Sequence, residues 1–130
     1  RHVKTALSGE GAAVLGSRFN SKGRKLVYAA GSLSLAMLEI LAQAGDRSRL
    51  LEYVCIPIDV NESQVESTEL TDLPKRWYAR PHVAASQHFG DRWLDEAPSV
   101  VLRVPSVIIP AEHNYLINPD HPDFPKLLIG

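Results

Sequence analysis

Residues 26–45 read LVYAAGSLSLAMLEILAQAG, and this stretch decides both the fold and the site that we expect. It is almost wholly apolar or small, and its only charged residue is Glu39. A carboxylate near the middle of a segment with core composition costs free energy unless something there needs it. The sequence therefore singles out Glu39 as a candidate functional group.

The stretch divides into a strand and a helix. Residues 25–29 are predicted to be a strand that Gly31 ends, and residues 33–43 form the best helix pattern in the chain. Ser32 is a suitable N-cap, and Gly45 suits the C-terminal end. Both faces of this helix are largely apolar, which predicts that it is packed on both sides.

The surrounding elements are short. Residues 14–20 and 25–29 are expected to pair as a β-hairpin around residues 21–23, and residues 50–58 look like a central strand that is apolar on both faces. Residues 59–75 form a polar surface connection with room for one strand. Further on, we expect a helix over residues 86–94 and strands over residues 100–104 and 107–109. This order predicts an α+β fold in a single compact domain, residues 1–130.

Composition excludes several classes of protein. A chain of 130 residues is long enough for one core, and a net charge of −1 suggests no general affinity for nucleic acid or anionic membranes. The single cysteine, Cys55, excludes an internal disulfide and fits a reducing compartment. The apolar stretch around Glu39 is interrupted, so it is not predicted to span a membrane. Because the chain begins at Arg1, we expect a slightly truncated N-terminus.

Common site motifs are absent. Residues 11–17 imitate a phosphate-binding loop, but Ser17 stands where that loop needs lysine, and Val14 breaks the dinucleotide glycine pattern. The histidine spacings match no zinc-ligand pair, so we expect no metal site. Cys55 lies in an apolar run and is expected to be a small buried hydrophobe rather than a nucleophile.

Six short motifs follow one another along the chain: Ser8-Gly-Glu-Gly-Ala12, Gly16-Ser-Arg-Phe-Asn20, Val27-Tyr-Ala-Ala30, Ser34-Leu-Ala-Met-Leu-Glu39, Val104-Pro-Ser106 and Glu112-His-Asn-Tyr-Leu-Ile-Asn-Pro119. In their order and spacing, from about residue 6 to residue 124, they resemble the RES domain. This domain is the toxin half of bacterial RES–Xre toxin–antitoxin pairs. The resemblance implies a fold similar to ADP-ribosyltransferases, with a mixed β core and a few helices. Family members often have glycine and tryptophan where this chain has Ser17 and Phe19, and both changes leave Arg18 in place.

The resemblance also implies site residues. Arg18, Glu39 and Ser106 match the arginine, glutamate and serine for which the family is named, and Tyr28 matches a further active-site residue. Glu39 would stabilise positive charge on the ribose of NAD, and Arg18 would bind the phosphates in a bidentate manner. Tyr28 would offer its ring to nicotinamide and its hydroxyl at the rim. Ser106 would donate to a phosphate or ribose oxygen.

The implied function is consumption of NAD as a substrate, with no other cofactor. ADP-ribose would pass to water or inorganic phosphate, and the loss of NAD would arrest growth. The alternatives are a mono-ADP-ribosyltransferase that modifies a protein, a non-catalytic module that binds NAD or an antitoxin, and a structural domain without a ligand. The implied partner is an Xre-family antitoxin that covers the site and makes any DNA contact itself. The expected location is the cytoplasm, away from membranes.

Overall fold

The computed structural model describes residues 7–44 and 53–130, and it has the α+β architecture that the sequence predicts. Its helices are α2 (Glu10–Leu15), α3 (Leu33–Ala44) and α4 (Ala84–Glu96), with single 3-10 turns η2 (Glu62–Gln64), η3 (Leu70–Asp72) and η4 (Phe124–Lys126). Its strands are β1 (Val27–Ala30), β2 (Ile58–Asp59), β3 (Val65–Ser67), β4 (Val101–Pro105), β5 (His113–Ile117) and β6 (Leu128–Ile129).

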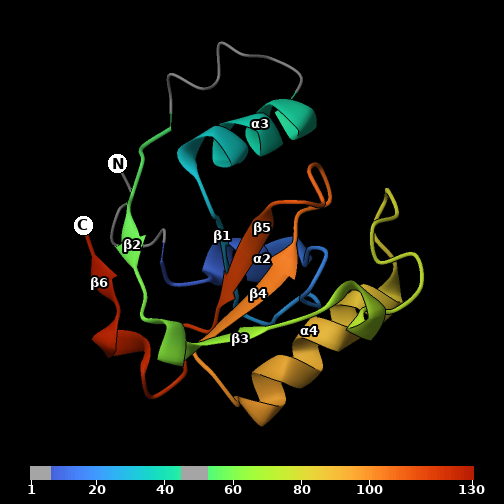
Figure 1. The fold of residues 1–130 in the computed structure, drawn as a ribbon. Helices are drawn as coiled ribbons and strands as arrows, with labels where there is room; N and C mark the ends of the chain where they lie inside the picture. Colours follow the sequence, from blue (N-terminus) through green and yellow to red (C-terminus); the bar gives the residue numbers. More distant parts are fainter. Residues whose placement is uncertain (1–6, 45–52) are drawn as a thin grey trace.

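The main sheet has the strand order β1-β5-β4-β3, so its two central strands come late in the chain (Figure 1). β5 is antiparallel to β1 and β4, whereas β3 and β4 are parallel. The small sheet β2-β6 is separate and antiparallel. The sheet is therefore mixed, as the predicted mixed β core requires.

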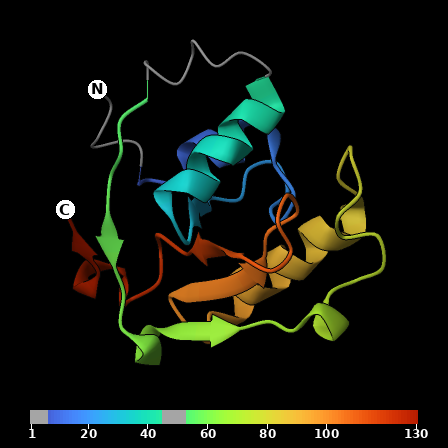
Figure 2. The same cartoon turned by 45° about the horizontal axis from the view of Figure 1, so that its top comes forward.

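Among the described residues, two hydrophobic clusters form the core, one on each face of the main sheet, because successive strand side chains point to opposite faces. On the α4 face, Trp93 packs with Leu102 and Leu116. On the other face, Val101 and Ile117 belong to the second cluster. α3 follows β1 directly and lies beyond the end of the sheet rather than on either face (Figures 1 and 2).

The predicted hairpin is wrong. α2 includes residues 14 and 15 of its supposed first strand, and the rest of that segment contributes an isolated bridge between Ser17 and Asn20. Gly9 and Gly16, with φ of 78° and 79°, flank α2 in a backbone region that favours glycine. The true partner of β1 is β5, because each residue of β1 lies opposite one of residues 114–117.

Two predicted strands are also wrong. Of residues 50–58, the first three lie outside the described residues, residues 53–57 form no strand, and the edge-paired β2 begins only at Ile58. Tyr53 and Val54 are more than half exposed and Cys55 is exposed, so this apolar run is not a central strand and its thiol is not buried. Residues 107–109 form a turn, because the N–H groups of residues 108 and 109 donate to the Ser106 hydroxyl.

The helix predictions are confirmed at both positions. In α3, the Leu35 N–H donates to the Ser32 hydroxyl at 3.1 Å, as an N-cap requires, while Gly45 lies outside the described residues. The prediction that this helix is packed on both sides is wrong, because Leu33, Met37 and Leu38 are 58 %, 40 % and 40 % exposed. The predicted surface connection over residues 59–75 contains one main-sheet strand, β3. No helix within the described residues is long and apolar enough to cross a membrane.

Candidate active site

The Glu39 carboxylate lies in the middle of α3 and accepts a hydrogen bond on each oxygen. Ser106 Oγ donates to Oε2 at 3.1 Å, and Asn114 Nδ2 donates to Oε1 at 3.0 Å. The two donors come from the turn after β4 and from β5, so three separate parts of the chain meet at one carboxylate. Glu39 is only partly buried. Its orientation is therefore fixed while the group stays accessible to a ligand.

The Ser106 side chain is hydrogen-bonded to Glu39 and is shielded from solvent. Ser106 is fully buried, and its Oγ accepts the N–H groups of Ile108 and Ile109 at 3.1 and 3.2 Å. A hydroxyl has one hydrogen to donate, and here that hydrogen goes to Glu39. Direct donation from Ser106 to a phosphate or ribose oxygen would require breaking this bond.

Asn114 is a site residue that the sequence reasoning missed. It lies on β5 opposite Ala30 of β1 and Val104 of β4, and its Nδ2 also reaches the Ala29 carbonyl at 3.3 Å. The available signal was its place within residues 112–119, the last motif of the resemblance, two positions before the buried Leu116. That spacing places Asn114 on the same sheet face as Leu116.

Tyr28 presents its ring outward and its hydroxyl inward. The residue is 38 % exposed, but its hydroxyl donates to Asn20 Oδ1 at 2.7 Å and accepts the Phe19 N–H at 2.9 Å. Asn20 is itself fully buried and donates to the Ala12 and Arg24 carbonyls at 2.9 Å. Burial raises the pKa of the Tyr28 phenol to about 12. The exposed ring can contact a ligand, whereas the hydroxyl holds the 17–20 segment.

Replacing Tyr28 by phenylalanine should destabilise the fold by about 1–3 kcal/mol, because the Phe19 N–H and Asn20 Oδ1 lose their partner. Since the pKa is raised in the folded state, the phenol contributes stability fully below pH 10 and loses it as the pH rises towards 12. Urea unfolding at neutral pH and at rising alkaline pH measures both effects. Tyr78→Phe is the matched control, because Tyr78 is 60 % exposed. Equal stability of Tyr28→Phe and wild type would contradict this role.

The Arg18 guanidinium is anchored by one nitrogen. Its Nη1 donates to the Trp77 and Ala79 carbonyls at 2.7 and 2.8 Å, and its own carbonyl accepts the Ser86 hydroxyl at 2.7 Å. Burial, followed by the like charge of Arg80, lowers the pKa of Arg18 from its usual value. The two Nη1 bonds fix the guanidinium plane, so its other edge has a defined direction.

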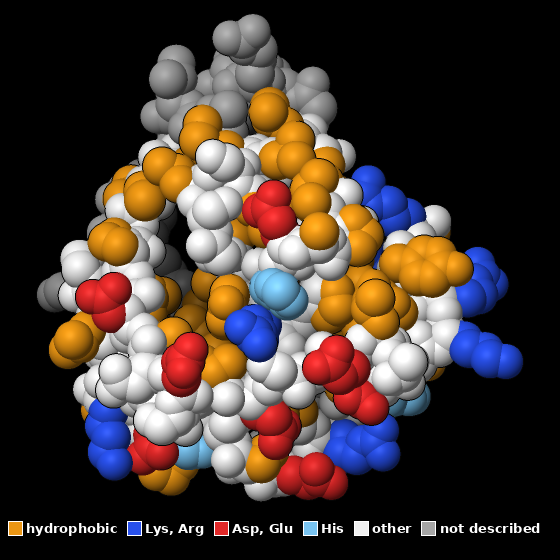
Figure 3. All heavy atoms as spheres, viewed as in Figure 1, with side chains coloured by type: hydrophobic (Ala, Val, Ile, Leu, Met, Phe, Trp, Pro, Cys, Tyr) orange, Lys and Arg blue, Asp and Glu red, His pale blue; other side chains and the backbone are white. Residues whose placement is uncertain are grey.

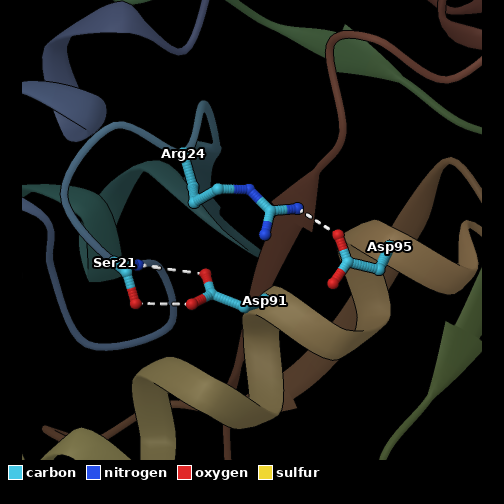
Figure 4. A network of polar contacts seen from close by, with 4 residues as sticks. All are labelled: Ser21, Arg24, Asp91 and Asp95. Carbon is cyan, nitrogen blue, oxygen red and sulfur yellow. Dashed lines mark hydrogen bonds and ion pairs between the residues drawn. The ribbon is translucent and has the colours of Figure 1, made fainter.

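Helix α4 holds the segment that carries Arg18. Asp91 accepts the Ser21 N–H at 3.0 Å and the Ser21 hydroxyl at 2.5 Å, and one turn later Asp95 forms an ion pair with Arg24 at 2.6 Å (Figure 4). The Ser21–Asp91 pair is partly buried and doubly bonded, whereas Asp95 is exposed and its ion pair contributes little. The position of Arg18 therefore depends on a helix almost 70 positions away.

The structure thus brings the predicted site residues together in two groups. Glu39 and Ser106 are in direct contact, and Arg18 and Tyr28 meet around the 17–20 segment. The register connects the groups, because Tyr28 lies opposite Leu116 and therefore shares a sheet face with Asn114. Figure 3 shows hydrophobic side chains gathered over α3 in this region. Within the described residues, no cluster of three His, Cys, Asp or Glu side chains could hold a metal ion.

Comparison with known sequences identifies the family of this chain. A sequence model of the RES domain matches residues 1–129. The chain belongs to the RES domain family. Two similar proteins are each called Toxin Res: one from Photorhabdus laumondii and one from Yersinia enterocolitica. Each is 37 % identical over 128 residues, which cover 98 % of this chain and 82 % or 84 % of the relative.

A third relative of this RES domain has a more specific name. It is the Prs ADP-ribosylating toxin of a Sphingobium species, 40 % identical over 120 residues, which cover 90 % of this chain and 74 % of that protein. The predicted resemblance is therefore confirmed over nearly the whole chain. The names describe activities of the relatives.

Proposed function

We propose that this RES domain is the toxin of a bacterial toxin–antitoxin pair and cleaves the bond between nicotinamide and ribose in NAD, with water or phosphate as acceptor. The observation that supports this most is the Glu39 carboxylate, partly exposed and held by Ser106 and Asn114. Support also comes from the family, in which similar proteins are called toxins.

The proposed chemistry needs an oriented negative charge. As nicotinamide leaves, the ribose gains positive charge, and its transition state resembles that of glycoside cleavage. A carboxylate fixed beside the sugar stabilises this charge more in the transition state than in the ground state. Because Ser106 and Asn114 fix Glu39 before any ligand arrives, little reorganisation is needed during the reaction.

Substrate binding would use the second group of residues. The exposed ring of Tyr28 offers a flat apolar face for nicotinamide, and Arg18 offers a positive charge for the phosphates. NAD would be consumed as a substrate, and no further cofactor is needed in this scheme.

A second candidate is transfer of ADP-ribose to a protein side chain. The Sphingobium relative, called an ADP-ribosylating toxin, favours this reading. The bond that breaks is the same, and only the acceptor on the open face of the ribose differs. In either case we propose that an Xre-family antitoxin restrains the protein by covering the site, and that DNA contact is made by the antitoxin.

The deciding experiment is product identification after incubation of the purified chain with NAD, with and without inorganic phosphate and with an added bacterial protein extract. Nicotinamide release with free ADP-ribose indicates water as acceptor, and a phosphorylated ADP-ribose indicates phosphate. Label on a protein indicates the second candidate. A folded protein that releases no nicotinamide under any of these conditions would contradict both.

Asn114→Ala should lower kcat by about 10- to 100-fold with little change in KM, because a hydrogen bond to a charged group is worth about 1.5–3 kcal/mol. The expected loss follows from the freer Glu39 carboxylate. Asn118→Ala is the matched control: Asn118 is also buried, but its side chain accepts the Asp120 N–H and does not contact Glu39. Steady-state nicotinamide release measures both, and equal kcat losses in the two variants would count against this role.

A further inference from the structure

The loop between η3 and α4 carries positive charge without compensation. Residues 73–90 include Lys75, Arg76 and Arg80 but no Asp or Glu. In the two described ranges, the ion pairs are Arg24–Asp95 and Lys126–Asp123, so no loop cation has a carboxylate partner there. Figure 3 shows Lys and Arg side chains along the right-hand edge of the molecule, over this loop.

Arg18 joins this loop through only one of its nitrogens. Both hydrogens of Nη1 are used by the Trp77 and Ala79 carbonyls. Among the described residues, no hydrogen bond engages Nη2 or Nε. These two nitrogens form one edge of the guanidinium fork, and such an edge matches two oxygens of a phosphate.

Arg80 directly follows Ala79, the residue whose carbonyl Arg18 holds at 2.8 Å, and it is exposed. After burial, the like charge of Arg80 is the second cause that lowers the pKa of Arg18. The repulsion between these two like charges raises the electrostatic free energy of the unliganded protein, and a bound anion would reduce it. The N-terminus of α4 adds to the positive potential, since it has no side-chain cap and its Ser86 touches the Arg18 carbonyl.

We propose that Arg80 and the free edge of Arg18 form a subsite for a diphosphate, with Arg80 contributing specificity for the dinucleotide over a mononucleotide. This inference rests on the proposed function for its substrate, NAD, and adds a residue outside the motifs that the sequence resemblance covers. Two neighbouring phosphate groups match two neighbouring guanidinium groups in charge. A ligand with a single phosphate gains the contact with Arg18 but lacks a second anionic group for Arg80.

Binding of ADP and AMP to the full chain, measured by calorimetry, tests the subsite without any catalysis. Wild type should bind ADP about tenfold more tightly than AMP, and Arg80→Gln should remove most of that preference while Arg80→Lys keeps part of it. Arg76→Gln is the matched control, because Arg76 is an exposed arginine on the same loop. Arg80 is exposed, so its variants should unfold at the wild-type temperature.

Equal affinity of wild type for ADP and AMP would overturn the subsite, as would an unchanged ADP preference in Arg80→Gln or an equal loss in Arg76→Gln. Nicotinamide release from NAD by the same variants separates this inference from the proposed function. Release that is unaffected by Arg80→Gln leaves the proposed reaction standing and overturns the subsite. An Arg80-dependent ADP preference without any nicotinamide release supports the subsite and contradicts the proposed reaction.

Discussion

Glu39→Gln is expected to reduce nicotinamide release from NAD by about 10²- to 10³-fold in kcat, the size of loss found when one electrostatic transition-state contact is removed. Glutamine has nearly the same shape, so Asn114 can still donate to its oxygen, but the negative charge that would stabilise the ribose is gone. Since the charge matters most in the transition state, KM should change much less than kcat. Steady-state kinetics at saturating NAD, with a thermal melt of each protein, measures the effect.

Glu112→Gln is the control for this substitution. Glu112 is exposed in the turn between β4 and β5, close in sequence to Asn114, and its backbone carbonyl rather than its side chain accepts the Ser106 N–H. It should keep wild-type kcat. If folded Glu39→Gln released nicotinamide at the wild-type rate, the carboxylate would have no part in the reaction and the proposed mechanism would be wrong.

Gly90→Ala should have the largest effect on stability. A Cβ at Gly90 would lie 1.7 Å from the Phe19 carbonyl oxygen and 2.6 Å from its carbon, so α4 would have to move away from the 17–20 segment. Backbone atoms cannot rotate aside as a side chain can, and overpacking of this kind costs about 3 kcal/mol or more. The melting temperature should fall by roughly 10 °C or more.

Gly11→Ala gives the matched comparison, because a Cβ at Gly11 meets nothing within 4 Å and Gly11 lies inside α2. Alanine is the better helix former by about 1 kcal/mol, so this variant should be as stable as wild type or slightly more stable. Thermal and urea unfolding of the two variants side by side decides the matter. Melting temperatures of Gly90→Ala and wild type within 2 °C or so of each other would mean that the helix approach is not tight.

The fold was predictable where the pattern is local. α3 and α4 were predicted because apolar residues at helical spacing report directly on helix formation. The pairing of β1 was not predicted correctly, because the apolar segment closest to it in sequence is not its partner. Its partner, β5, lies more than 80 positions away. The predicted central strand over residues 50–58 was wrong because apolar composition alone does not show burial. Its side chains are typical of a buried strand, yet Tyr53 and Val54 are exposed.

The candidate site shows the same division. Glu39 stood out from composition, because it is the one charge in an apolar stretch. Arg18, Tyr28 and Ser106 needed the family resemblance, since a single arginine, tyrosine or serine has no distinctive spacing. The Tyr28 hydroxyl is hydrogen-bonded to the buried Asn20, and Asn114 contacts Glu39. Both contacts depend on how separate segments pack, so no local sequence pattern predicts them.

The position of β5 in the chain has a consequence for synthesis. Ser106 and Asn114 lie 67 and 75 positions after Glu39, and β5, which carries Asn114, is also the strand that pairs with β1. A growing polypeptide that ends before residue 106 therefore carries Glu39 without either donor. One that ends before residue 113 still lacks Asn114 and leaves β1 without its neighbour in the sheet. Translation must pass β5 before the carboxylate can be set in place, so the proposed activity is absent while most of the chain is being made.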